Sequence, residues 1–357
     1  MQSILSTGYS VFFNNNGYEA LNSYLNSNVH STIFVLVDTN TNDNCLSKFL
    51  SHVVTEIKIE IIEIEPSETN KNIETCVELW SALSDLGADR KSILINLGGG
   101  VVTDIGGFVA ATFKRGISFI NVPTTLLAMV DAAIGSKNGV DLDNLKNQIG
   151  TITSPEMVLV DTEFLETLAQ NQMRSGLAEM LKHGLIADES YWRKFQNLQK
   201  IDYADFDTLI FESIEIKNRI VLQDPTEEGI RKALNFGHTL GHAIESHFMS
   251  KENYLLHGEA IAIGMILESF LSMKLNLIDN SEFALIKKQL ISIFGATEFS
   301  AEDIAEIITL LKHDKKNEFG KVKFALLDGI GKIKIDQQVD NDMIKASFED
   351  YKNTSFI

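Results

Sequence analysis

Half of the histidines of the chain fall within residues 235–265: His238, His242, His247 and His257. His238 and His242 are four residues apart, so on a helix they share one face. His257 follows after a loop, at the expected start of a second apolar helix. Two helices that direct imidazoles to one place form a common zinc site. Each histidine alone is equally typical of a helix surface or of a hydrogen-bonded core side chain.

A zinc site needs a further ligand, and the candidate is Glu179 within the segment RSGLAEMLKHG (174–184). Glu179 lies between Ala178 and Met180, on an otherwise apolar helix face. Burying a carboxylate there is costly unless a positive group neutralises it. One glutamate and two histidines leave one position on zinc open, which is the pattern of catalytic sites and not of structural ones.

The bulk composition limits the class of protein. A chain of 357 residues favours two domains, and 44% hydrophobic with 22% charged residues is typical of globular proteins. The net charge of −18 argues against nucleic acid and anionic membranes as partners. Two cysteines indicate no disulfide framework, and no signal peptide or membrane-spanning run is visible. We therefore expect a cytoplasmic location.

Strand and helix patterns alternate through residues 1–162. The expected strands are 32–37, 56–65, 92–97, 118–122 and 157–160, and the expected helices are 72–86 and 102–113. This alternation predicts an α/β domain whose parallel sheet has helices on both faces. Ligands of such sheets bind beyond the carboxyl ends of the strands.

Helical periodicity dominates residues 163–357, which we expect to form a mainly α-helical second domain. The expected helices are 174–187, 206–222, 232–248, 257–275, 281–293 and 301–313, followed by a short strand at 321–327. The cleft between the two domains is the default ligand site.

A glycine run, residues 98–100, directly follows one expected strand and precedes a helix. Backbone without side chains lets a pyrophosphate approach the helix N-terminus. The run is not the G-x-G-x-x-G fingerprint, so a tight strand-to-helix turn is the alternative. Asp38 and Asn40, after an earlier strand, suit ribose hydroxyls, or else ordinary loop and cap roles.

Two further groups of side chains suit an anionic substrate. The polar segment 131–147 contains Lys137, Lys146 and Asn147, although its composition alone favours a solvated loop. The second group surrounds the histidines in the sequence: Lys182, Lys217, Arg231 and Asn235. Cations beside a metal suit a substrate with carboxylate and phosphate groups, whereas each one alone is typical of an exposed helix face.

Taken together, these segments resemble the 3-dehydroquinate synthase family over nearly the whole chain. The motifs are Glu68-x-x-Lys71, GGGVVTD (98–104), FKRG (113–116), PTTLLAMVD (123–131), the lysine-bearing loop 137–147, GLAEMLKHG (176–184), RKALNFGHTLGHA (231–243) and HGEAIAIGM (257–265).

The resemblance implies a Rossmann-like N-terminal domain that binds NAD, a helical C-terminal domain that binds one Zn²⁺ or Co²⁺, and a homodimer. The implied metal ligands are Glu179, His238 and His257. The implied NAD contacts are Asp38, Asn40, Glu68, Lys71, Gly100, Val101, Val102, Thr103, Asp104, Thr124, Thr125, Asp131, Lys137, Lys146, Phe164, Leu165, Glu166 and Thr167. The implied substrate contacts are Lys137, Asn147, Lys182, Lys217, Arg231, Asn235, His242, Lys316 (with Lys315 as the alternative) and Arg115, the last from the neighbouring subunit.

The implied reaction converts 3-deoxy-D-arabino-heptulosonate 7-phosphate to 3-dehydroquinate and phosphate, in the shikimate pathway to aromatic amino acids. It consists of transient oxidation at C5 by NAD, β-elimination of phosphate, re-reduction and intramolecular aldol closure. His242 is expected to move a proton near the C5 oxygen. Lys137, Lys217 and Arg231 are expected to hold the substrate carboxylate.

The chain departs from the family pattern at three places. Ala132 and Ala133 stand where the family usually has Ser-Ser, and residues 136–139 read SKNG in place of GKTG. The segment 151–154, before Pro155, lacks the usual aromatic residue or histidine. Three alternatives remain open: cyclases that make inosose or valiolone rings, iron-dependent alcohol dehydrogenases that release NADH, and a non-catalytic homologue that binds NAD or metal. Arg231, Lys217 and Asn235 favour a substrate with a carboxylate over the first alternative.

Overall fold

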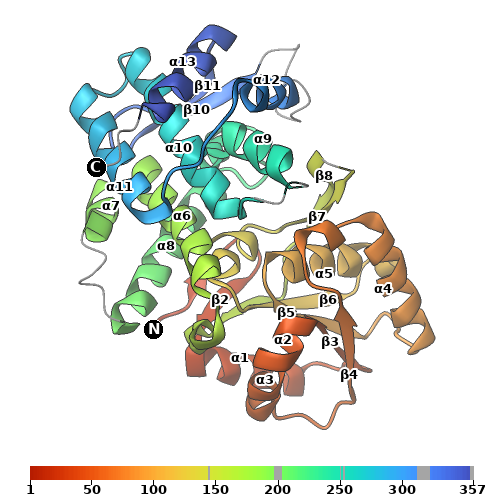
Figure 1. Ribbon diagram of the computed structural model, residues 1–357. Coiled ribbons are helices and arrows are strands. Elements are labelled where there is room, and N and C mark those ends of the chain that lie inside the picture. Colours follow the sequence, from red (N-terminus) through yellow and green to blue (C-terminus); the bar gives the residue numbers. More distant parts are fainter. Residues whose placement is uncertain (144, 197–202, 250, 252–253, 312–321, 354–357) are drawn as a thin grey trace. The chain divides into compact units, whose positions relative to one another are not determined.

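The chain forms two compact units in the computed structural model, Met1–Met173 and Arg174–Ile357 (Figure 1). The structure describes residues 1–143, 145–196, 203–249, 251, 254–311 and 322–353. The predicted α/β first part and mainly helical second part are both confirmed. The division follows Met173, whereas the sequence analysis placed it after residue 162. Lys315 and Lys316 lie outside the described residues.

The first unit alternates strands and helices as predicted. Its strands are β1 (Ile4–Leu5), β2 (Ser10–Phe13), β3 (Ile33–Asp38), β4 (Ile59–Ile64), β5 (Ile93–Gly98), β6 (Ser118–Pro123), β7 (Lys137–Leu142), β8 (Leu145–Ile152) and β9 (Met157–Val160). Its helices are α1 (Asn14–Ser27), α2 (Thr39–Thr41), α3 (Ser47–His52), α4 (Ile73–Asp85) and α5 (Gly100–Thr112), with the short turns η1 (Asn42–Leu46), η2 (Glu68–Asn70), η3 (Phe113–Arg115), η4 (Ala128–Ala132) and η5 (Thr162–Thr167).

Seven strands form one sheet in the order β1-β2-β9-β6-β5-β3-β4, in which only the β1–β2 pair is antiparallel. The central strands β3 and β5 are almost continuously apolar, which suits strands that are covered on both faces. The carboxyl ends of β3, β5 and β6 therefore lie next to one another at one edge of the sheet.

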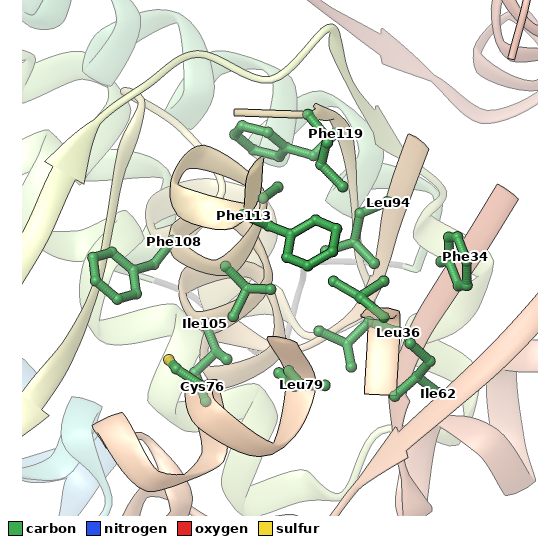
Figure 2. Packing of buried hydrophobic residues seen from close by; sticks show 14 of the residues in the cluster. Phe34, Leu36, Ile62, Cys76, Leu79, Leu94, Ile105, Phe108, Phe113 and Phe119 are labelled. Atoms are coloured by element: carbon green, nitrogen blue, oxygen red, sulfur yellow. The ribbon is translucent and has the colours of Figure 1, made fainter. Parts of the chain in front are cut away.

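Helices cover both faces of this sheet. On one face, α4 and α5 pack on the strands (Figure 2) through the cluster Phe34, Leu36, Leu94, Phe119, Cys76, Leu79, Ile105 and Phe108. On the other face, Leu159 of β9 lies against α1, where a Cβ on Gly17 would come 2.8 Å from the Leu159 Cγ. The strand register supports this assignment, because Val158 pairs with Asn121, on the Phe119 side, and Leu159 must then point away.

The segment 131–147 is not the solvated loop that its composition favoured. Lys137–Leu142 and Leu145–Ile152 pair as the antiparallel hairpin β7–β8, and Asn138, Asp141 and Lys146 are buried in it. A Cβ on Gly139 would come 2.5 Å from the Ile149 carbonyl oxygen, so the strands cross closely at this glycine. The composition misled because these polar groups are satisfied by hydrogen bonds and ion pairs when they are buried, which hydropathy does not register.

The second unit is mostly helical. Its elements are α6 (Gln170–Ala187), α7 (Glu189–Lys194), α8 (Tyr203–Gln223), η7 (Ile230–Asn235), α9 (His238–Phe248), α10 (His257–Lys274), α11 (Asn280–Phe294), α12 (Ala301–Leu310), β10 (Lys323–Leu327), β11 (Ile333–Gln338) and α13 (Asn341–Lys352). The single helix predicted at 232–248 is wrong. The chain forms the 3₁₀ turn η7 and then α9, because Gly237 adopts a φ of 77° between them. Among the described residues, no helix is long and apolar enough to cross a membrane.

Helices α9 and α10 touch backbone to backbone. A Cβ on Gly264 of α10 would come 2.0 Å from the Gly237 carbonyl oxygen and 2.8 Å from the Gly241 nitrogen. At its start, α10 also meets α6, where a Cβ on Gly258 would come 2.2 Å from the Ser175 carbonyl oxygen. Glycines at these positions therefore set how closely α6, α9 and α10 approach.

We expect Gly264→Ala to destabilise the protein by about 1–3 kcal/mol, the usual cost of overpacking. The direction of this change in stability is informative, because alanine has a higher helix propensity than glycine and by itself would stabilise the helix by up to about 1 kcal/mol. The measurement is the urea midpoint of the metal-free protein, where a ligand cannot compensate. An unchanged or raised midpoint would show that α9 and α10 separate without cost.

Candidate functional site

Three acidic and imidazole side chains from three helices meet in the second unit. Glu179 lies on α6 and is fully buried, while His238 and His257 are the first residues of α9 and α10. The Glu179 Oε1 lies 3.4 Å from the His238 Nε2 and 3.6 Å from the His257 Nε2. The structure thus brings together the three side chains that the sequence predicts as metal ligands.

The hydrogen bonds of the two imidazoles favour one tautomer. The Nδ1 of His238 lies 3.1 Å from the Phe236 carbonyl oxygen, and the Nδ1 of His257 lies 3.1 Å from Glu245 Oε2. Both partners are acceptors, so Nδ1 carries the proton and the Nε2 lone pairs face Glu179. Two such lone pairs and a carboxylate fit a divalent metal of the zinc type.

In the metal-free protein, the surrounding carboxylates favour protonation of His257. Burial by itself lowers the pKa of His257, but the carboxylates of Glu245 and Glu179 outweigh burial and raise that pKa to about 10. Cation binding therefore has to displace this proton, as is usual for histidine ligands.

His242 lies one turn after His238 and belongs to the same group. The ring centroid of His242 lies 5.1 Å from that of His238 and 5.8 Å from that of His257. The nitrogens of the three rings come within 4.8 Å of one another. The geometry thus allows two overlapping ligand sets, one with Glu179 and one with His242.

Buried cations accompany the cluster. Lys182 forms an ion pair with Glu179 one turn along α6, and both side chains are inaccessible to solvent. Lys217 on α8 and Arg231 on η7 are also buried. The Arg231 Nη1 donates to the Pro225 carbonyl oxygen at 2.7 Å, which fixes one side of the guanidinium. Asn235, at the end of η7, donates to Glu227 Oε1 at 3.0 Å.

Two glutamates near the cluster were missed by the sequence analysis. Glu245 bonds His257, and Glu268 of α10 is a fully buried carboxylate that accepts the N–H groups of Gly237 at 2.7 Å and Leu240 at 3.1 Å. Glu268 thereby caps the N-terminus of α9, where negative charge is favourable, and fixes His238. An acid inside an otherwise apolar helix was the only sequence signal for Glu268.

We expect Glu245→Ala to weaken metal binding by about 10–100-fold, the usual effect of removing a carboxylate that orients a histidine ligand. Competition with a chromogenic chelator measures this directly. The matched control is Glu306→Ala, because Glu306 Oε2 lies at the same distance, 3.1 Å, from the Nδ1 of another histidine, His247. Equal metal affinity in both variants would exclude the role of Glu245.

In the first unit, the glycine turn joins β5 to α5 at the carboxyl edge of the sheet. Gly99 precedes the first helical residue, Gly100, and the Thr124 N–H donates to the Gly98 carbonyl oxygen at 3.0 Å. A Cβ on Gly99 would come 3.1 Å from the Thr125 Cγ2. The predicted residues of this turn and of the end of β6 are thus neighbours at the N-terminus of α5, the kind of helix end that binds phosphate groups in other proteins.

Asp38 has the cap role that was its alternative interpretation. Its Oδ1 accepts the Thr41 N–H at 2.8 Å at the start of α2, while Asn40 is exposed. The other predicted contacts lie on several elements: Phe164 and Leu165 are core residues of η5, Glu166 and Thr167 are exposed, and Arg115 is exposed on η3 with a φ of 70°. Asp131 lies on η4 and is half-buried.

The predicted lysine contacts form a network with acids. The Lys71 Nζ lies 2.5 Å from Asp104 Oδ2 and 2.7 Å from Asn147 Oδ1. The Lys146 Nζ donates to Glu68 Oε1 at 2.7 Å. Burial lowers the pKa of Lys71, but Asp104 and Glu68 outweigh burial and hold that pKa above its ordinary value, so the lysine stays charged.

The comparisons with known proteins decide the family. The model for the N-terminal part of 3-dehydroquinate synthase matches residues 61–175, and the model for the C-terminal part matches residues 176–317. The 3-dehydroquinate synthase of Parabacteroides distasonis is 40% identical over 336 residues, which cover 94% of this chain and 95% of that protein. The chain belongs to the 3-dehydroquinate synthase family.

Two solved structures share the fold of this member of the 3-dehydroquinate synthase family. A 2-deoxy-scyllo-inosose synthase in complex with carbaglucose-6-phosphate, NAD⁺ and Co²⁺ aligns with a TM-score of 0.86 at 24% identity, covering 98% of this chain and all (100%) of that one. The 2-epi-5-epi-valiolone synthase of Streptomyces hygroscopicus, with NAD⁺ and Zn²⁺, aligns with a TM-score of 0.84 at 24% identity, covering 99% of each chain.

The departures from the usual 3-dehydroquinate synthase motifs are accommodated locally. The Asn138 Nδ2 donates to the carbonyl oxygens of Ser136 at 3.1 Å and Thr153 at 2.9 Å. The Ser136 Oγ lies 2.9 Å from the Ser154 Oγ. Hydrogen bonds therefore hold the residues on both sides of Lys137, which is exposed at the start of β7.

Proposed function

We propose that this protein is a 3-dehydroquinate synthase that uses NAD and one divalent metal, Zn²⁺ or Co²⁺, and works as a homodimer. Its substrate would be 3-deoxy-D-arabino-heptulosonate 7-phosphate, and its products 3-dehydroquinate and phosphate. The observation that carries the proposal is the meeting of His238 Nε2 and His257 Nε2 at Glu179, at 3.4 and 3.6 Å, with Lys182 paired to the same carboxylate.

Glu179, His238 and His257 would hold the cation, and the turn 98–104 with Thr124 and Thr125 would hold NAD. When bound, NAD would supply reversible hydride transfer at C5, and the cation would supply charge stabilisation for the substrate oxygen. Lys182 forms an ion pair with the buried Glu179 carboxylate and so compensates for the cost of burying its charge. With an eliminating phosphate as leaving group, the reaction class is a carbon–oxygen lyase.

The remaining side chains would bind and orient the substrate. Arg231, Lys217 and Lys137 suit the carboxylate, because a guanidinium binds carboxylates through two donors and ammonium groups add charge. His242 would take and return the proton of the C5 hydroxyl. Asn147 and Asn235 would donate to substrate hydroxyls. Arg115 would reach the phosphate across the dimer, and Lys316, or Lys315 in its place, would contact the substrate.

The test is phosphate release from the heptulosonate phosphate by purified protein with NAD and zinc, while NADH absorbance is followed. Stoichiometric phosphate without net NADH, abolished by a chelator, is expected. Steady accumulation of NADH would instead identify a dehydrogenase. Phosphate release from glucose 6-phosphate, which lacks the carboxylate, would identify a sibling cyclase. Binding of NAD and metal without any phosphate release would leave a non-catalytic homologue.

A further inference from the structure

The hairpin β7–β8 contains a bulge at the residues that the proposed function uses. Val140 pairs with Ile149, and Leu142 pairs with Leu145. Between these pairs, β7 contributes only Asp141, whereas β8 contributes residues 146–148. Bulges of this kind redirect side chains and are frequent beside functional sites. Here the bulge carries Lys146 and Asn147.

Asp141 holds the bulge from the opposite strand. Its Oδ1 accepts the Asn147 N–H at 2.6 Å, and its Oδ2 lies 3.3 Å from the Lys146 Nζ. Its own N–H donates to the Lys71 carbonyl oxygen at 2.9 Å. One buried residue thus contacts Lys71, Lys146 and Asn147, although the family motifs assign it no role.

The hydrogen bond from the Asn147 N–H to Asp141 stabilises an unfavourable backbone conformation at Asn147. Asn147 has a φ of 52°, in the left-handed region that costs free energy for residues with a Cβ. This backbone conformation places its Oδ1 2.7 Å from the Lys71 Nζ. Asp141 is therefore linked to Lys71 in two ways. It bonds Asn147, whose side chain contacts the Lys71 Nζ, and its own N–H donates to the Lys71 carbonyl oxygen.

The negative charge of Asp141 also stabilises the position of Lys146. The network joins Lys71 and Lys146 to three carboxylates, those of Glu68, Asp104 and Asp141. Without Asp141, Lys146 would lose one of its ion pairs, and its ion pair with Glu68 involves a side chain that is 38% exposed and not held by burial. The hairpin itself would survive, because its remaining cross-strand pairs do not involve Asp141.

We propose that Asp141 is a positioning residue, which fixes Lys146 and Asn147 on the bulge and thereby sets the affinity of the first unit for NAD. This inference rests on the proposed function only in taking NAD as the ligand. Asp141 itself contacts no substrate atom in this assignment; it acts through the two residues that it holds.

The test is the dissociation constant for NAD, measured by isothermal titration calorimetry with the full chain, for the wild type, Asp141→Asn and Asp141→Ala. Asparagine keeps an oxygen for the Asn147 N–H but loses the charge opposite Lys146, so we expect about tenfold weaker binding. Asp141→Ala loses both the acceptor oxygen and the charge, so it should bind NAD more weakly than Asp141→Asn. Asp143→Asn, at the exposed tip of the same hairpin, makes the same charge change and should bind like the wild type.

A second measurement separates positioning from general instability. Metal affinity should not change in any of these variants, because Glu179, His238 and His257 belong to the other unit. If the alanine variant does not fold, the asparagine variant decides. Wild-type affinity for NAD in a folded Asp141 variant would overturn the inference and leave the proposed function intact. Absence of NAD binding in the wild type would instead overturn the proposed function.

Discussion

His257→Ala is expected to lose the bound metal and to lower the rate of phosphate release by about 1000-fold or more. Metal contacts contribute several kcal/mol of charge stabilisation in the transition state, and each 1.36 kcal/mol corresponds to a factor of ten in rate. The variant removes one of the two Nε2 atoms that face Glu179 Oε1, at 3.6 Å. The measurement is the metal content per subunit after gel filtration, followed by the rate with added zinc.

His247→Ala is the matched control for this variant. His247 is also buried, but its Nε2 bonds Asp303 Oδ1 at 2.7 Å and not Glu179. It should keep a full complement of metal. Comparison of Glu179→Gln with His242→Ala then separates the two overlapping ligand sets. Loss of metal only in the glutamine variant supports the set with Glu179. Stoichiometric zinc in His257→Ala would refute that residue as a ligand.

Arg231→Ala is expected to raise the KM for the heptulosonate phosphate by about 100-fold or more, since removing one partner of a buried charge pair costs about 2–5 kcal/mol. Arg231 is 2% exposed, and the Asp224 Oδ2 accepts its backbone N–H at 2.9 Å, so both its backbone and its guanidinium are held before substrate arrives. Arg231→Lys should recover only part of this loss, because an ammonium lacks the two-donor geometry.

A second measurement tests whether Arg231→Ala affects only the binding of the substrate carboxylate. The affinities for NAD and for metal should stay at their wild-type values in this variant. Arg219→Ala, at an exposed position of α8, controls for the loss of a positive charge. Wild-type KM in Arg231→Ala would contradict the assignment of the carboxylate. It would also favour a sibling cyclase, whose substrate has no such group.

The sequence alone determined the features that depend on local pattern. Period-two and period-3.6 apolar repeats predicted five strands (β3, β4, β5, β6 and β9) and two helices (α4 and α5) of the α/β unit, and most of the helices of the second unit. They did not predict β1, β2, α1, α3 or the hairpin β7–β8. Motifs predicted the family, and the spacing of His238, His242 and His257 around a loop predicted a cluster that the structure does bring together. Each of these signals is short in sequence, because it reflects one helix face, one turn or one strand end.

Other features were decided only by the tertiary structure. The break at Gly237 follows from the close approach of Gly264, which lies on another helix. Glu268 caps a helix to which it does not belong, and Asp141 is buried because a bulge on the facing strand supplies its partners. In each case, a residue distant in the sequence satisfies a backbone or charged group. Composition and periodicity within a window do not contain the partner, so the chain had to be folded before these roles became visible.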